Sequence, residues 1–276
     1  MASTSVIGFD SAWTDDPKKP GAVCVFRLSG DGRVSFVDCQ MASFDQALII
    51  VRREQVLSKK CLVALDQPTI VPNVTGCRPV ERVAGSLISW MGGGVQPSNR
   101  SRKGMFDDDA PIWHFLERLQ ATEHPELARE AAEGLFLLEV FPALALAGFD
   151  LKYCERLAAP KYNPERRKTY KPSDWLDVIG TLEAVAAIHS VGGISLWLST
   201  QFGREKPSKS DQDKVDSVIC AFIGLHWLAA PRNHSMRIGD IETGYIVAPA
   251  MNGKHLRITS AAARLGVPVD GQVPLS

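Results

Sequence analysis

The chain has 276 residues and carries 31 basic and 31 acidic side chains, so its formal net charge at pH 7 is zero. Hydrophobic residues make up 45% and charged residues 22%, which is typical of globular proteins and excludes disorder over most of the length. The balanced charge argues against a globally basic nucleic-acid binder, although it leaves room for a local basic groove. Because no repeat or change of composition divides the sequence, we expect one elaborated domain over residues 1–276.

The first 68 residues are expected to form four strands and one helix. The strands are short runs rich in apolar and β-branched residues, over 5–10, 21–28, 34–41 and 61–66. The sequence Ser-Gly-Asp-Gly-Arg at 29–33 predicts a hairpin turn between the second and third strands. Ser43 and Gln46 form a capping-box pattern that begins a helix ending near residue 58. The order is therefore β-β-β-α-β, with the strand after the helix parallel to the first strand.

The later elements alternate less regularly. Helical patterns cover residues 78–91, 109–122, 173–191 and 211–230, and apolar strands cover 135–141 and 243–249. The last of these helices is expected to start with three aspartates. Its apolar part is interrupted by Gly224, His226 and Trp227. We therefore interpret it as a buried helix and expect no membrane association.

The six cysteines show neither a C-x-x-C pair nor a zinc-like spacing to histidine. Cys24, Cys39 and Cys61 lie in apolar, strand-like runs, where a thiol behaves as a small hydrophobic side chain. No signal-peptide pattern is visible over Met1 to Ser5. We therefore expect no disulfides and a cytoplasmic protein.

Five acidic residues occupy informative positions. Asp10 and Asp66 end predicted strands, Glu139 lies within the next apolar strand, and Asp213 and Asp216 share one face near the start of the buried helix. The carboxyl ends of parallel strands meet at one edge of an open α/β sheet, where ligands bind. Clustered carboxylates repel one another, and a divalent cation with oxygen ligands removes that cost. The pattern predicts a site for Mg²⁺ or Mn²⁺.

Each acid also has a purely structural interpretation. Acids in the first turn of a helix interact favourably with the helix dipole, which would account for Asp213 and Asp216. Asp66, which precedes Gln-Pro, could be a turn former. Glu139 could pair with an arginine. These alternatives remain open from the sequence alone.

The acids lie in motifs that resemble known nucleases. Gly8-Phe9-Asp10 resembles the opening motif of ribonuclease H-like nucleases, whose fold also begins β-β-β-α-β. The sequence Leu65-Asp66-Gln67-Pro68 is similar to the strand-four acid of the Holliday-junction resolvase branch. The run from Asp213 through Asp216 to Ser217 is similar to the Asp-x-x-Asp-small helix start of that branch.

A closer resemblance is to the predicted ribonuclease H-like nuclease family called domain of unknown function 429. It covers roughly residues 5 to 250 and rests on several short motifs. These are Asp66 with Pro68, Arg78 with Arg82, Glu139-Val140-Phe141-Pro142, and Gly244-Tyr245-Ile246. Phe141 stands where the family usually has histidine, and alanine follows the proline where an acid is common.

The resemblance implies an α/β fold with a ribonuclease H-like mixed sheet, flanked by helices and carrying helical insertions. It also implies two-metal phosphodiester hydrolysis. Asp10, Asp66 and Asp216 would be the metal ligands, and Asp213 would be a ligand or a close neighbour. Glu139 would hold an outer water or orient a basic residue.

Basic residues could contact the phosphates of a substrate. The candidates come from the predicted helix 78–91 and from the basic stretch 152–171, and they are Arg78, Arg82, Arg166, Arg167 and Lys168. Tyr162 and Tyr170 are interleaved with the basic stretch and could stack on bases. The alternative is a solvated surface loop. Arg78 and Arg82 share a predicted helix face, so they could equally pair with Glu139.

These observations favour a metal-dependent nuclease that hydrolyses phosphodiester bonds and has nucleic acid as its partner. The alternative is a non-catalytic nucleic-acid or protein-binding module on the same fold. An actin-like or sugar-kinase-like ATPase would need glycine-rich turns after the first strand. The sequence Ser11-Ala12-Trp13-Thr14 lacks them, which disfavours that class.

Overall fold

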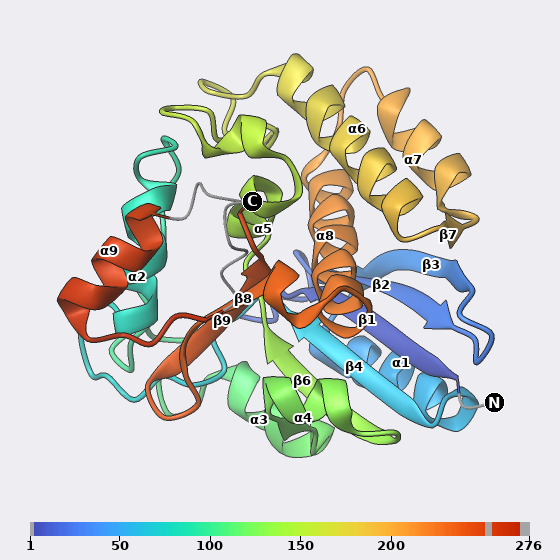
Figure 1. The fold of residues 1–276 in the computed structure, drawn as a ribbon, viewed down its shortest axis with the longest axis horizontal. Helices are drawn as coiled ribbons and strands as arrows, with labels where there is room; N and C mark the ends of the chain where they lie inside the picture. Colours follow the sequence, from blue (N-terminus) through green and yellow to red (C-terminus); the bar gives the residue numbers. More distant parts are fainter. Residues whose placement is uncertain (1–2, 252–255, 271–276) are drawn as a thin grey trace.

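The computed structural model describes residues 3–251 and 256–270. A mixed seven-stranded sheet, flanked by helices, forms its centre (Figure 1). The strands are β1 (Thr4–Asp10), β2 (Gly21–Leu28), β3 (Val34–Ala42), β4 (Lys60–Leu65), β5 (Thr122–Glu123), β6 (Gly134–Glu139) and β7 (Val191–Gly192). Their spatial order is β5-β6-β4-β1-β2-β3-β7.

The strand directions bring the acid-bearing strand ends together. β1, β2 and β3 form antiparallel hairpin pairs, whereas β4 runs parallel to β1 and β6 runs parallel to β4. The arrowheads of β4 and β6 accordingly meet near the middle of the molecule in Figure 1. The predicted β-β-β-α-β order and the parallel β1–β4 pair are confirmed. The capping box of Ser43 and Gln46 is also present.

The helices cover both faces of the sheet and extend beyond it. Their bounds are α1 (Phe44–Leu57), α2 (Pro79–Ile88), α3 (Pro111–Leu119), α4 (Pro125–Glu130), α5 (Pro142–Phe149), α6 (Pro172–Ile188), α7 (Ile194–Phe202), α8 (Lys209–Ala229) and α9 (Leu256–Leu265). Two 3₁₀ turns are η1 (Leu151–Cys154) and η2 (Arg232–His234). One apolar core lies between the sheet and α8 with α5 and α6, and a second lies under α1 and α3.

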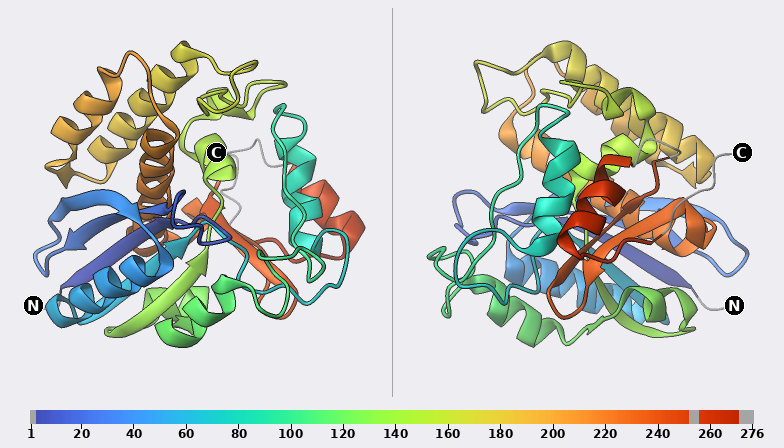
Figure 2. Two further views of the ribbon diagram at one scale, coloured as in Figure 1. Left: turned by 180° about the vertical axis from the view of Figure 1, so that it is seen from behind. Right: turned by 60° about the vertical axis from the view of Figure 1, so that its left-hand side comes forward.

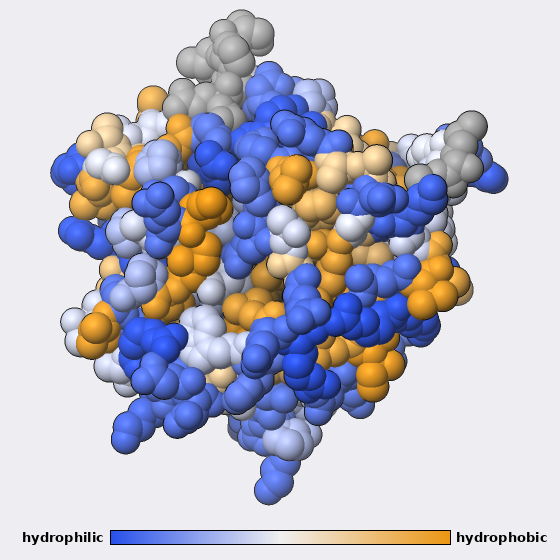
Figure 3. Space-filling model, turned by 90° about the horizontal axis from the view of Figure 1, so that it is seen from below, coloured by the Kyte–Doolittle hydropathy of each residue, from blue (hydrophilic) through white to orange (hydrophobic). Residues whose placement is uncertain are grey.

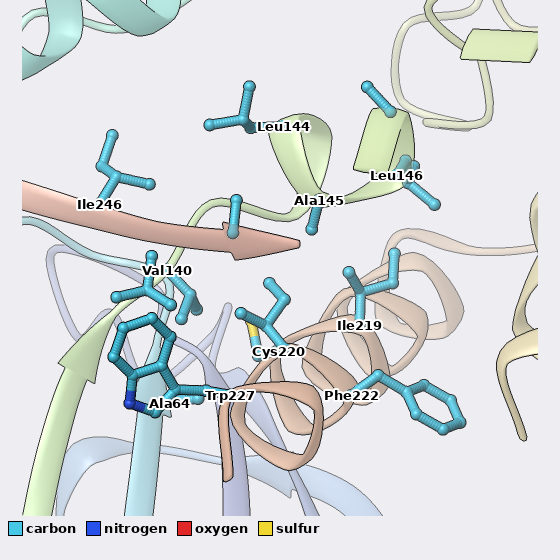
Figure 4. Packing of buried hydrophobic residues seen from close by; sticks show 14 of the residues in the cluster. Ala64, Val140, Leu144, Ala145, Leu146, Ile219, Cys220, Phe222, Trp227 and Ile246 are labelled. Carbon is cyan, nitrogen blue, oxygen red and sulfur yellow. The ribbon is translucent and has the colours of Figure 1, made fainter. Parts of the chain in front are cut away.

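A two-stranded sheet extends the fold away from α8. It consists of β8 (Ser235–Asp240) and β9 (Gly244–Pro249), and β9 meets the end of β6 through a bridge between Val140 and Val247. Side chains from α5, α8 and β9 gather at this junction (Figure 4). α2 and α9 pack side by side on the flank beyond it (Figure 2).

Gly8 explains how α8 comes so close to the sheet. A Cβ at this position would lie 2.1 Å from the backbone oxygen of Ser217 and 2.2 Å from the backbone nitrogen of Ala221. Only glycine therefore permits this contact between the backbones of β1 and α8. Because Asp10 follows two residues later, the same contact brings the first half of α8 near the end of β1.

The start of α8 differs from the prediction. The helix begins at Lys209, and Ser208 is its N-cap, in a capping box with Asp211. Asp213 and Asp216 consequently lie beyond the first turn, where the helix-dipole interpretation gives them little stabilisation. The signal that was missed is the Ser-x-x-Asp spacing of 208–211, which competes with the aspartates as a helix start.

The prediction for the helix over 78–91 also needs correction. Arg78 is the N-cap of α2 and not part of the helix, so it does not share a helical face with Arg82. The sequence patterns did not predict several short elements, namely α4, α5, α7, β8 and α9. α5 is apolar all round because it is buried among other helices, which leaves no amphipathic pattern to detect.

Cys24, Cys39 and Cys61 are buried thiols within β2, β3 and β4, as the apolar context predicts. No helix in the described ranges is both long enough and apolar enough to cross a membrane. The face carrying α1, α3 and α4 is shown from below in Figure 3. It is largely hydrophilic, with smaller hydrophobic patches between the polar residues.

Candidate active site

Four aspartates from three separate elements line one pocket. Asp10 ends β1, Asp66 follows β4, and Asp213 and Asp216 come from α8. The pocket has a volume of about 450 Å³, and we call it the acidic pocket. It lies at the carboxyl edge of the parallel strands, which is where ligands bind in open α/β sheets.

The acidic pocket makes its carboxylates unusually hard to ionise. Burial raises the pKa of Asp10 well above its ordinary value, and the charges of Asp216, Asp66 and Asp213 raise it further. Burial likewise raises the pKa of Asp66, with Asp216 and Glu139 adding to the effect. The pKa of Asp216 rises to about 6, chiefly through burial. Mutually repelling carboxylates that are largely withdrawn from solvent are found at functional sites more often than elsewhere.

Lys209 is the basic residue whose charge opposes the rise in pKa of Asp10, Asp66 and Asp216. Burial opposes its charged form, but Asp10, Asp216 and Asp213 outweigh burial and raise the pKa of Lys209. Its ammonium group donates a hydrogen bond to Asp213 Oδ1. The lining of the pocket also contains the acids Asp16 and Glu165 and the cations Lys19 and Arg166, so acidic groups remain in excess over basic ones.

Two neutral side chains hold Asp216 in place. The Tyr162 hydroxyl donates to Asp216 Oδ1 over 2.6 Å, and the Gln212 amide donates to Asp216 Oδ2. Tyr162, which was expected to stack on bases, thus holds a carboxylate, and Lys209 and Gln212 were not predicted as site residues. Lys209 and Gln212 could have been found from their spacing, because Lys209–Asp213 and Gln212–Asp216 are i, i+4 pairs on a helix.

The segments that follow β1 and β4 are tied together. The backbone nitrogen of Asp66 donates to Phe9 O over 2.9 Å, and Trp13 Nε1 donates to Asp66 O over 3.0 Å. Ser11 and Gln67 are buried and hydrogen-bonded to each other through their side chains. These contacts fix the relative positions of Asp10 and Asp66. They also show that the loop 11–14 has a structural role, which the sequence patterns did not reveal.

Glu139 belongs to a neighbouring ionic cluster. It accepts two hydrogen bonds from Arg78, 2.6 Å from Nη2 and 2.8 Å from Nη1, and one from the backbone nitrogen of Thr69. Arg78 also binds Glu81 through Nε at 2.8 Å. Burial raises the pKa of Glu139 even though Arg78 opposes that effect. Of the two interpretations left open for Glu139, the structure shows the arginine pair.

The predicted basic residues are placed very differently from one another. Arg166 lines the acidic pocket and its two neighbouring cavities, whereas Arg167 lines a separate shallow surface pocket. Lys168 and Arg82 are exposed. Arg78 is 1% exposed and fully engaged with Glu81 and Glu139. The structure therefore brings one predicted substrate-binding residue, Arg166, to the four aspartates.

The donor chemistry of the acidic pocket suits Mg²⁺ or Mn²⁺, which prefer carboxylate oxygens. Among the described residues, however, no three His, Cys, Asp or Glu side chains are arranged as a ready-made ligand set. Asp213 and Asp216 are instead engaged by Lys209, Tyr162 and Gln212. Cation binding at this pocket would require some of these side chains to turn.

A protein family described as "Protein of unknown function (DUF429)" matches residues 8–236. The chain belongs to the DUF429 family. The matched range includes Asp10, Asp66, Asp213 and Asp216, as well as Arg78, Glu139 and Arg166 of this DUF429 protein. No curated protein and no solved structure matches the chain.

Proposed function

We propose that this DUF429 protein is a nuclease of the ribonuclease H-like class that hydrolyses phosphodiester bonds with Mg²⁺ or Mn²⁺. The convergence of Asp10, Asp66 and Asp216 at one sheet edge carries the proposal. The three antiparallel strands followed by a helix and a parallel strand support the fold assignment. The buried thiols of Cys24, Cys39 and Cys61 support a reducing compartment, which agrees with a cytoplasmic location.

The residues of the acidic pocket would have different roles, according to their positions. Asp10, Asp66 and Asp216 would supply carboxylate oxygens to the cation, and Asp213 would hold Lys209 beside them. When bound there, divalent cations would supply activation of water and stabilisation of the leaving oxygen. Arg166 would counter the charge of the substrate phosphate, because it lines the same pocket.

Glu139 has a positioning role in this proposal. Its charge is matched by Arg78, and the pair lies next to Asp66 in a neighbouring cavity. It holds the end of β6 and the start of α2 in a fixed relationship beside the acidic pocket. Arg78 and Arg82 are therefore not assigned to substrate.

Thermal unfolding with chelator and with Mn²⁺ tests the proposal without knowledge of the substrate. Mn²⁺ should raise the melting temperature of the parent, since a ligand that binds only the folded state stabilises it. Asp10→Asn and Asp216→Asn should lose most of this shift and should be at least as stable as the parent in chelator, because one repelling charge is gone. Both variants should also lose Mn²⁺-dependent cleavage of labelled oligonucleotides.

Asp211→Asn provides the matched control on the same helix. Asp211 caps α8 through Ser208 and pairs with Arg204 at 3.0 Å, so its loss should lower stability but leave the Mn²⁺ shift intact. Equal Mn²⁺ shifts in all variants, or no shift in the parent, would contradict the metal site.

A non-catalytic binding module is the second candidate. The observation that favours it is the engagement of Asp213 and Asp216 by Lys209, Tyr162 and Gln212. In a binding module these contacts would be the final arrangement, and a phosphate or peptide ligand would bind at Arg166. Oligonucleotide binding that needs no cation, without any cleavage, would decide for this candidate.

A further inference from the structure

A second, smaller cavity adjoins the acidic pocket. Its volume is about 220 Å³, and its walls are the end of α2 with the glycines that follow, the start of α5, and the segment 159–163. We call it the apolar cavity. Most of its lining is hydrophobic and includes Ile88, Met91, Phe141, Pro142, Leu146 and Pro160.

The two cavities share a wall. Asp66, Asp216, Gln212 and Arg166 line both of them. Tyr162 lines the apolar cavity, and its hydroxyl is bonded to Asp216 of the acidic pocket at 2.6 Å. If the charged group of a ligand bound in the acidic pocket, the part of the ligand bonded to that group would therefore lie in the apolar cavity.

The walls of the apolar cavity are held together by backbone hydrogen bonds. Ala159 N donates to Met91 O over 2.8 Å, and Leu157 N donates to Trp90 O over 3.0 Å. The loop over residues 161–171 is closed by a third bond, in which Lys171 N donates to Lys161 O over 2.8 Å. The first two bonds join segments that are more than 60 residues apart in sequence, so the cavity is largely formed before a ligand binds.

We propose that the apolar cavity receives one nucleobase of the substrate while the attached phosphate lies in the acidic pocket. The substrate class is then an unpaired nucleotide, in a single strand or turned out of a duplex. This inference rests on the proposed function, because that function places the phosphate. A base has two apolar faces and one polar edge, which matches hydrophobic walls with Asn163 and Gln212 at the lining.

The apolar cavity is large enough for a single base and too small for a base pair. Pockets for drug-sized ligands span about 300–1,000 Å³, and this one is smaller at about 220 Å³. Phe141 is positioned to act as a stacking surface, since it lines this cavity and the cavity of Glu139 next to it. Phe141 would thus determine specificity for a base, and no proton transfer is assigned to it.

Calorimetric binding of two probes in the presence of Mn²⁺ tests the inference. Thymidine 5′-monophosphate and 2-deoxyribose 5-phosphate carry the same phosphate, but only the former has a base. The parent should bind the nucleotide about tenfold more tightly, which is in the range expected for stacking of one base. Ala143→Phe, which fills the apolar cavity, should reduce that ratio to near one.

Two further variants keep the test decisive. Ala159→Phe fills the same cavity from the segment 159–163 and should act like Ala143→Phe if that variant folds poorly. Ala184→Phe places the same ring on the exposed face of α6 and should keep the tenfold ratio. Both cavity variants should retain the Mn²⁺ shift in melting temperature, because the aspartates are untouched.

The outcomes separate this inference from the proposed function. Equal affinities for the two probes in the parent, no binding of either probe, or a preserved ratio in the cavity variants would overturn the base site even if the Mn²⁺ shift persists. If the parent prefers the nucleotide tenfold but Mn²⁺ does not raise its melting temperature, the result would support the base site and contradict the proposed nuclease function.

Discussion

Arg78 and Glu139 form a two-pronged ion pair in the interior, with Nη2 to Oε1 at 2.6 Å and Nη1 to Oε2 at 2.8 Å. Arg78 is 1% exposed and Glu139 is 2% exposed. The pair joins the residue before α2 to the end of β6, next to the acidic pocket. Removal of one partner of a buried pair leaves an unmatched charge in a region of low polarity.

We therefore expect Glu139→Gln to lower the free energy of unfolding by about 3 kcal/mol, since Arg78 would keep only Glu81 as a charged partner. Asp66→Asn is the matched comparison, because it neutralises a nearby acid that has repelling neighbours and no arginine partner. It should be as stable as the parent or slightly more so. Urea unfolding at neutral pH measures both, and equal losses in the two variants would refute the distinction.

Substitution of Gly8 should disturb both stability and the acidic pocket. The added methyl group of Gly8→Ala would meet the backbone of α8 at Ser217 and Ala221, where no side chain can turn aside. We expect a loss of about 3 kcal/mol or poor folding, at the upper end of the cost of overpacking. If the variant folds, its Mn²⁺ shift should also fall, because α8 is moved away from Asp10.

Gly180 is the control for that experiment. It lies inside α6, and a Cβ there would meet nothing within 4 Å. Gly180→Ala should therefore stabilise the protein by about 1 kcal/mol through helix propensity. A Gly8→Ala protein with parental stability in urea would contradict the close contact between the backbones of α8 and β1.

Glu123 should make stability depend on pH. Burial raises the pKa of Glu123 to about 7, and Glu139 adds to that rise, whereas a hydrogen bond from Thr69 opposes it. The unfolded chain releases this proton near the ordinary pKa of 4.5. The folded state thus binds more protons between these values, so the contribution of Glu123 to stability declines as the pH rises from about 4.5 to about 7.

Glu123→Gln mimics the protonated form at every pH. The variant should match the parent near pH 4.5 and exceed its free energy of unfolding by about 3 kcal/mol at pH 8, because the pKa rises by about 2.5 units at about 1.4 kcal/mol per unit. Urea titrations at the two pH values give the comparison. A difference that does not change with pH would mean that Glu123 is already ionised in the folded protein.

Arg166 and Arg167 are neighbours in sequence that should behave differently. Arg166 lines the acidic pocket and the apolar cavity, whereas Arg167 lines neither. Arg166→Ala should weaken binding of a labelled single strand and reduce the slope of log K against log salt by about 0.7, the value for one phosphate. Arg167→Ala should change the slope much less. Fluorescence anisotropy over a series of NaCl concentrations measures the slope, and equal effects would assign both residues to a general basic surface.

The local patterns of the sequence were sufficient to predict the first part of the fold. Apolar runs, the turn at 29–33 and the capping box of Ser43 and Gln46 are local signals, and the structure contains the predicted elements. The positions of Asp10 and Asp66 at the ends of parallel strands followed from the same signals. Their approach to each other could be predicted because parallel strands place their carboxyl ends at one edge.

Only the tertiary structure could decide which acids share a pocket and which are neutralised. The sequence left open whether Glu139 joins the acidic cluster or pairs with an arginine, and the structure shows that Arg78, 61 residues earlier in the chain, matches its charge. Asp213 and Asp216 join Asp10 because Gly8 lets α8 rest on β1, a contact between backbones that local periodicity does not encode. The sequence by itself determined the strands and the acids at their ends. The packing of α8 and the choice of partner for each charge depended on distances between segments far apart in the chain, and those distances exist only once the core has formed.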